Sequence, residues 1–149
     1  MNFKENVYLI YKKLLSEKIN HIQQTLQDLS NSAANETKST AGDKHETALA
    51  MLQLEQENKR KQLNDLLQQQ SLFNKLDPSI ISPYILNGSL ITTDQGYFFI
   101  SVALGKIHYK EKTIFAVSPS APLGQKLMGH QTGESIEVNG RTYYITGVE

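Results

Sequence analysis

Six residues near the middle of the chain set its architecture: Ala41-Gly42-Asp43-Lys44-His45-Glu46. They separate two long segments that are rich in Leu, Gln, Glu and Lys, all of which have high helix propensity. Residues 5–75 contain no proline and a single glycine, Gly42. The pattern predicts two long helices that reverse direction near residue 41. Two carboxylates, Asp43 and Glu46, lie three residues apart at this turn.

Both helical segments carry a stripe of residues at alternating steps of four and three, the spacing of a coiled-coil seam. In the first segment the stripe is Leu15, Ile19, Ile22, Leu26, Leu29 and Ala33. In the second segment it is Leu49, Leu52, Gln56, Lys59, Leu63, Leu66, Gln70 and Phe73. We therefore expect an antiparallel coiled-coil hairpin over residues 1–76. The polar residues Gln56 and Lys59 either fix its register or reach out of a narrow seam.

The sequence changes character at Asp77-Pro78, because proline cannot continue a helix. Short β-forming runs follow, separated by turns that contain glycine. We expect strands at residues 90–93, 97–102, 106–109, 113–117, 135–138 and 142–148, and one short helix at 121–128. Residues 77–149 thus predict a small α+β domain, with an antiparallel sheet around one helix.

Composition narrows the classes of function. Lys and Arg number 15, as do Asp and Glu, so the chain lacks the basic field that drives sequence-independent nucleic-acid binding. A protein partner is then expected to bring it to any nucleic acid. The absence of cysteine excludes disulfides, thiolate metal sites and cysteine nucleophiles. The polar N-terminus and the short apolar runs predict a cytoplasmic protein with no membrane partner.

Two motifs resemble the bacterial Gre transcript cleavage factors of the GreA/GreB type. The first is Gly42-Asp43-Lys44-His45-Glu46, which matches that family's Gly-Asp, two variable residues and Glu. The second is Pro122-Leu123-Gly124-Gln125-Lys126-Leu127-Met128-Gly129, followed by Gly133-Glu134-Ser135-Ile136-Glu137-Val138. Ala121 stands where the family usually has Ser. Thr47-Ala48-Leu49-Ala50 replaces the family's Asn-Ala-Glu-Tyr, which removes an acid and an aromatic residue.

The resemblance implies an FKBP-like second domain and an accessory factor that is not itself an enzyme. Such a factor docks on RNA polymerase, inserts its hairpin into the secondary channel and stimulates cleavage of backtracked RNA. Asp43 and Glu46 would be lent to a polymerase-bound Mg²⁺, and the free factor would hold no cofactor. Carboxylates at i and i+3 lie on one side of a helix and suit such a hard cation. Lys38 and Lys44 are candidates for contacting the nascent RNA 3′ end or a phosphate, and we expect a monomer.

Several alternatives remain open. Asp43 and Glu46 also match a helix N-cap with an acid at position N3, which is a purely structural role. The altered residues after Glu46 suit a regulator that occupies the channel without stimulating cleavage. A peptidyl-prolyl isomerase or chaperone needs an aromatic-lined pocket, and the sequence shows no tryptophan and no aromatic cluster at family-specific spacing. A plain coiled-coil adaptor is the last alternative. If the chain binds polymerase, we expect contact around residues 118–130.

Overall fold

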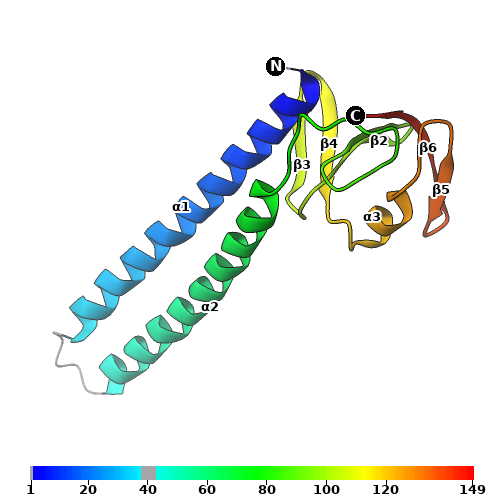
Figure 1. Cartoon of the computed structure of the whole chain (residues 1–149). Coiled ribbons are helices and arrows are strands. Elements are labelled where there is room, and N and C mark those ends of the chain that lie inside the picture. The colour runs from blue at the N-terminus through cyan, green and yellow to red at the C-terminus, as the bar shows by residue number, and fades with distance from the viewer. Residues whose placement is uncertain (1, 38–42) are drawn as a thin grey trace. The chain divides into compact units, whose positions relative to one another are not determined.

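The computed structural model describes residues 2–37 and 43–149, and the side chains of residues 36, 37 and 43–45 lie outside that description. Two long helices, α1 (Phe3–Thr37) and α2 (Asp43–Asn74), come first (Figure 1). They are followed by β1 (Leu90–Thr93), β2 (Gly96–Ile100), β3 (Gly105–Tyr109), β4 (Lys112–Val117), α3 (Pro122–Leu127), β5 (Ser135–Val138) and β6 (Arg141–Val148). The α+β class is confirmed, and every expected strand and helix is present to within two residues at each end.

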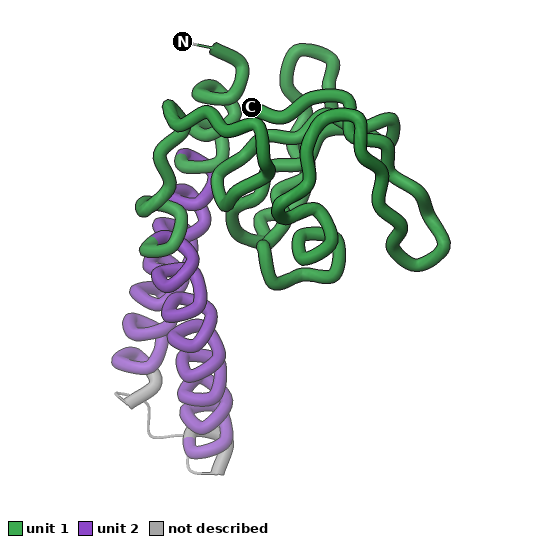
Figure 2. The backbone as a smooth tube through the Cα atoms, turned by 45° about the vertical axis from the view of Figure 1, so that its right-hand side comes forward, with its two compact units in different colours: residues 1–12, 71–149 green, residues 13–70 purple. Residues whose placement is uncertain are grey.

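The chain divides into two compact units (Figure 2). Residues 13–70 form the hairpin unit, and residues 1–12 together with 71–149 form the sheet unit. The beginning of α1 and the end of α2 therefore group with the sheet. The change of sequence character at Asp77-Pro78 instead predicts a boundary between residues 76 and 77.

Within the hairpin unit, α1 and α2 run antiparallel and side by side (Figures 1 and 2). Leu15, Ile19 and Ile22 are buried, and the rest of the predicted α1 stripe is half-buried. The α2 stripe is half-buried over the same alternation of four and three, from Leu49 to Gln70. Lys59 Nζ lies 3.6 Å from Glu55 Oε1 at the edge of the seam. The predicted seam is confirmed, and Lys59 reaches out of it to the rim.

The six strands form one sheet in the order β3-β4-β2-β1-β6-β5. Neighbouring strands are antiparallel except for β2 and β4, which are parallel. The prediction of an antiparallel sheet was wrong at this pair. The chain leaves β2 for the edge strand β3, and the tight β3–β4 hairpin then returns β4 beside β2 in the same direction. A pattern of strands along the chain does not identify which strands become neighbours.

Both faces of the sheet are covered within the sheet unit. Successive strand residues point to opposite faces, so Phe98 and Phe99 of β2 contribute to different cores. Phe98 belongs to a cluster that includes Leu127 of α3. On the other face, the ring of Phe99 lies 6.1 Å from that of Tyr11 and 6.2 Å from that of Phe73, centroid to centroid. The central strand β2 is therefore buried on both sides.

The helix ends are fastened to this second face by aromatic residues that lie outside the predicted α1 stripe. Tyr8 stacks on Phe73 with ring centroids 4.8 Å apart. The Tyr11 hydroxyl lies 2.8 Å from the carbonyl oxygen of Gly105 and 2.9 Å from that of Ile114. These contacts join the start of α1 to β3 and β4. Among the described helices, none combines the length and apolar content needed to span a membrane.

Candidate functional site

The predicted acidic pair falls at the start of α2. The helix begins at Asp43, and Glu46 in its first turn is exposed. A helical backbone over these residues places positions i and i+3 on one side. The side chains of Asp43 and Lys44 lie outside the described residues, and so does the whole of Lys38. The first turn of α2 therefore offers at least the Glu46 carboxylate to solvent.

The donor set at this turn suits an ion shared with a partner. Within the described part of the chain, no three His, Asp or Glu side chains gather as a metal site. Mg²⁺ in proteins commonly takes one or two carboxylates and fills its remaining positions with water and substrate phosphate. Acids in a first helical turn are also favoured by the helix dipole. Because α2 begins at Asp43, this residue lies in the first turn and not at the N-cap position that precedes it. A structural role in the first turn and a shared ion are both compatible with this helix start.

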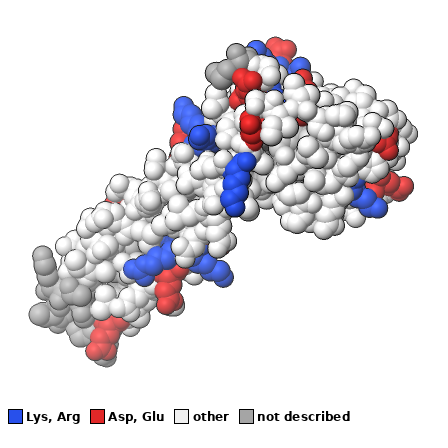
Figure 3. All heavy atoms as spheres, viewed as in Figure 1, with Lys and Arg blue, Asp and Glu red and all other residues white. Residues whose placement is uncertain are grey.

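Charge on the molecular surface does not form a track for nucleic acid on the face drawn in Figure 3. Acidic and basic residues are interspersed there between wide uncharged areas. In the basic run on α2, Lys59 lies on the half-buried seam while Arg60 and Lys61 are exposed. The run therefore points in several directions, as expected for a solvated helix.

The second motif builds the short helix α3. Pro122 occupies its first turn, where the fixed φ of proline is favourable. Ala121 at the N-cap has an extended backbone and makes no side-chain cap bond. Gly124 packs so tightly that a Cβ there would collide with the Ser118 carbonyl oxygen. Leu127 is fully buried, so this motif positions α3 against the sheet.

The residues after α3 form a hydrogen-bonded turn. Glu134 Oε1 accepts the Gln131 backbone N–H at 2.8 Å, and Glu134 Oε2 lies 3.1 Å from His130 Nδ1. Both hydrogen bonds lower the pKa of the Glu134 carboxyl, and the bond from the Gln131 N–H has the larger effect. The Gly-Glu part of the motif thus shapes the approach to β5.

Two adjoining hollows form a groove beside α3. One hollow of about 550 Å³ is lined by Ala121, Pro122, Leu123, Val138, Asn139, Arg141 and Tyr143. A second hollow of about 300 Å³ shares three of these residues and is lined by Gln95, Phe98, Phe115, Val117, Leu123, Arg141 and Tyr143. The groove combines an apolar floor with one cationic side chain, which is a surface suited to protein docking.

Three aromatic rings meet at the floor of this groove. Phe98 stacks on Phe115 at 5.6 Å and meets Tyr143 edge-on at 5.7 Å, centroid to centroid. The sequence shows no aromatic cluster at family-specific spacing, and the fold brings these three rings together from distant positions. The rings come from β2, β4 and β6, so no local spacing announces them. A sequence signal exists for two of the rings, because Phe98 shares its strand face with buried Ile100 and Tyr143 shares its face with buried Ile145.

The whole chain has distant structural neighbours among solved structures. No protein-family model and no curated protein sequence matches it. Among solved structures it is similar to the transcription factor Gfh1, at 13% identity and TM-score 0.37, over 92% of each chain. It is also similar to Thermus aquaticus Gfh1, at 14% identity and TM-score 0.34, over 91% of this chain and 92% of that one. Likenesses this distant assign neither a function nor a site.

Proposed function

We propose that this protein is an accessory factor of bacterial RNA polymerase that stimulates cleavage of backtracked RNA. The hairpin turn enters the secondary channel, and Asp43 and Glu46 are lent to a Mg²⁺ ion in the polymerase active site. The observation that carries the proposal is an acidic Gly-Asp-x-x-Glu motif at the turn between two antiparallel helices. The same chain carries the family-like α3 motif.

The chemistry of the turn supports this role. When bound, the second ion of a two-metal site supplies an activated water for phosphodiester hydrolysis. The part of this chain is to present carboxylate oxygens, of which the exposed Glu46 is one. A two-carboxylate donor set is too sparse to hold Mg²⁺ firmly by itself. Lys38 and Lys44, which flank the turn in sequence, would contact the RNA 3′ end or its phosphates as point charges.

The groove beside α3 is the surface that we propose docks on the polymerase. It overlaps the region expected from sequence, residues 118–130, through Ala121, Pro122 and Leu123, and extends onto β6 through Arg141 and Tyr143. Aromatic and Arg side chains are the residue types that most often dominate binding energy at interfaces. Replacing exposed Arg141 with Glu should weaken polymerase binding about tenfold or more, while an Arg60→Glu control on α2 should not.

The decisive experiment is RNA cleavage in a stalled, backtracked elongation complex with Mg²⁺. Wild-type protein should accelerate cleavage, and the double variant Asp43→Asn plus Glu46→Gln should abolish the acceleration while still binding polymerase. A matched control on the same helix is Glu57→Gln plus Asp65→Asn, which removes two exposed acids away from the turn. Equal cleavage by the wild type and the acidic-pair variant would refute the proposed role.

A second function is favoured by Thr47-Ala48-Leu49-Ala50, the residues that follow Glu46. Ala48 and Leu49 are half-buried, and Leu49 belongs to the α2 stripe. Residues that serve the seam leave no acid or aromatic side chain for the polymerase active site. A regulator of initiation or pausing would therefore bind polymerase but leave the rate of RNA cleavage in the backtracked complex unaltered. A pull-down paired with the cleavage assay separates the two functions.

A further inference from the structure

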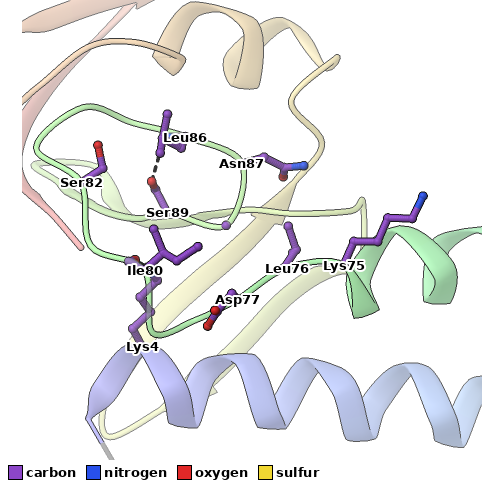
Figure 4. Close-up of a pocket in the computed structure, with 10 residues that line it drawn as sticks. Lys4, Lys75, Leu76, Asp77, Ile80, Ser82, Leu86, Asn87 and Ser89 are labelled. Atoms are coloured by element: carbon purple, nitrogen blue, oxygen red, sulfur yellow. Dashed lines mark hydrogen bonds between the residues drawn. The ribbon is translucent and has the colours of Figure 1, made fainter.

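A separate cavity lies in the sheet unit between the first turn of α1, the end of α2 and the segment that leads to β1 (Figure 4). Its volume is about 240 Å³, and its lining includes Lys4, Asp77, Ile80, Ser82 and Ser89. A water molecule occupies roughly 30 Å³ in the liquid. The cavity therefore has room for a small polyatomic ion with several waters.

Lys4 is unusual among the lysines because it is only 3% exposed. Its Nζ donates one hydrogen bond, at 2.7 Å, to the carbonyl oxygen of Ile80. An ammonium group has three donors, and a buried charge is costly unless it is paired. Among the described residues, no carboxylate lies within ion-pair distance of this amine. Burial lowers the pKa of Lys4, and the more distant Glu149 and Asp77 only partly offset this.

Two serine hydroxyls in the cavity wall also carry protons that are free to donate a hydrogen bond. Ser89 is buried, and its Oγ accepts the Leu86 backbone N–H at 2.8 Å. Ser82 Oγ accepts the Tyr84 backbone N–H at 3.1 Å. Each hydroxyl proton is left without an acceptor among the described residues. In Figure 4, Lys4 extends from α1 toward Ile80, Ser89 lies on the loop beyond, and Lys75 points away from both.

We propose that this cavity binds a small oxyanion, with Lys4 as its cationic ligand and the Ser89 and Ser82 hydroxyls as further donors. An oxyanion would supply the missing acceptors and a counter-charge in direct contact with the Lys4 amine, closer than Glu149 or Asp77, the latter of which also lines the cavity. Hydrogen bonds to charged groups are the stronger kind. A phosphate and a carboxylate share this chemistry. Bound there, the anion would link α1 to the segment between α2 and β1. The site is independent of the proposed role at the polymerase.

Binding is tested on the full chain at constant ionic strength with inorganic phosphate and, in a second arm, with acetate. Phosphate should bind saturably by calorimetry, and Lys4→Met should weaken binding about tenfold or more. Lys106→Met, which removes an exposed lysine on β3, serves as the matched control and should bind as the wild type does. Saturable binding of acetate with the same dependence on Lys4 would support the site and assign a carboxylate.

The wild type provides a readout that needs no variant. In ¹⁵N NMR of the lysine side chains, phosphate should shift the Lys4 Nζ resonance and raise its titration midpoint, because a bound anion stabilises the ammonium form. An unmoved Lys4 resonance would overturn the proposal even if Lys4→Met fails to fold. So would equal binding by wild type and Lys4→Met, or no binding of either anion.

Discussion

The hairpin unit and the sheet unit differ in how their own side chains are packed. In the described part of the hairpin unit, the buried side chains are Leu15, Ile19 and Ile22, and the facing stripe of α2 is only half-buried. In the sheet unit, β2 is buried on both faces, by α3 on one side and by the ends of α1 and α2 on the other. The hairpin unit is thus long and buries few side chains, whereas the sheet unit buries most of the apolar side chains of the core.

This contrast indicates that the sheet unit contributes more of the free energy of unfolding than the hairpin unit does. A two-helix seam that carries Gln56, Lys59 and Gln70 buries little apolar area per turn. The sheet core draws its residues from α1, α2, all of the central strands and α3, so each residue there has many partners. Changes in the sheet unit should therefore cost more than equivalent changes in the hairpin unit.

The comparison is tested most severely by Phe99→Ala. Phe99 is fully buried between the sheet and the helix ends, so its loss should cost about 3–5 kcal/mol of unfolding free energy. Leu63→Ala in the half-buried seam should cost about half as much. Urea denaturation followed by circular dichroism measures both, with exposed Tyr144→Ala as the neutral control. If Leu63→Ala proved the costlier change, stability would not be concentrated in the sheet unit.

Gly124→Ala tests how tightly α3 is seated on the sheet. The new Cβ would meet the Ser118 backbone, which cannot move without displacing the loop before α3. Overpacking of this kind should cost about 1–3 kcal/mol. The neighbouring change Gln125→Ala, at an exposed position of the same helix, should leave unfolding unaltered in the same denaturation assay. A neutral Gly124→Ala would show that the loop yields freely.

Tyr11→Phe probes the attachment of α1 to the sheet. Losing the hydroxyl removes the single O–H donor that the carbonyl oxygens of Gly105 and Ile114 share, and should cost about 1–2 kcal/mol at neutral pH.

The pH dependence of this variant has a definite sign. Burial raises the pKa of Tyr11, so the folded state keeps a proton that the unfolded chain releases at about pH 10. The stabilisation is complete below that pH and is lost as the pH rises further. The stability gap between wild type and Tyr11→Phe should therefore narrow above pH 10, by up to about 1.4 kcal/mol per pH unit. A constant gap would mean that the hydroxyl titrates normally.

Lys4 acts with the opposite sign. Its pKa is lowered by burial, so below the ordinary lysine pKa the unfolded state holds more protons and stability rises with pH. Comparing Tyr11→Phe with wild type at each pH cancels this contribution, because Lys4 is present in both.

Lys59→Leu is the smallest expected effect and has a favourable direction. An apolar side chain at this half-buried seam position should stabilise the hairpin unit by about 0.5–1 kcal/mol. The adjacent Arg60→Leu, on the exposed side of α2, should give no gain in thermal denaturation. A loss on Lys59→Leu would indicate that the lysine fixes the register rather than merely interrupting the seam.

Sequence patterns predicted what depends on neighbours along the chain. The α2 stripe, the six strands and α3 between Pro122 and Gly129 all follow from local periodicity or from turn residues. The parallel pairing of β2 with β4, the joining of Tyr8 and Tyr11 to the sheet unit, and the aromatic floor of the α3 groove depend on contacts between distant segments. Buried Lys4 has no local signal either, since it belongs to a polar N-terminal run.

The fastening of Tyr11 has a consequence for how the chain is made. Its two carbonyl partners lie 94 and 103 residues further along, and the partner of Lys4 lies 76 residues further along. During synthesis, Val7, Tyr8 and Tyr11 therefore leave the ribosome long before the strands that bury them are made. Those side chains stay exposed to solvent during most of synthesis. A nascent chain arrested before Ile114 would contain the complete hairpin sequence but would lack the β4 carbonyl to which Tyr11 at the start of α1 binds.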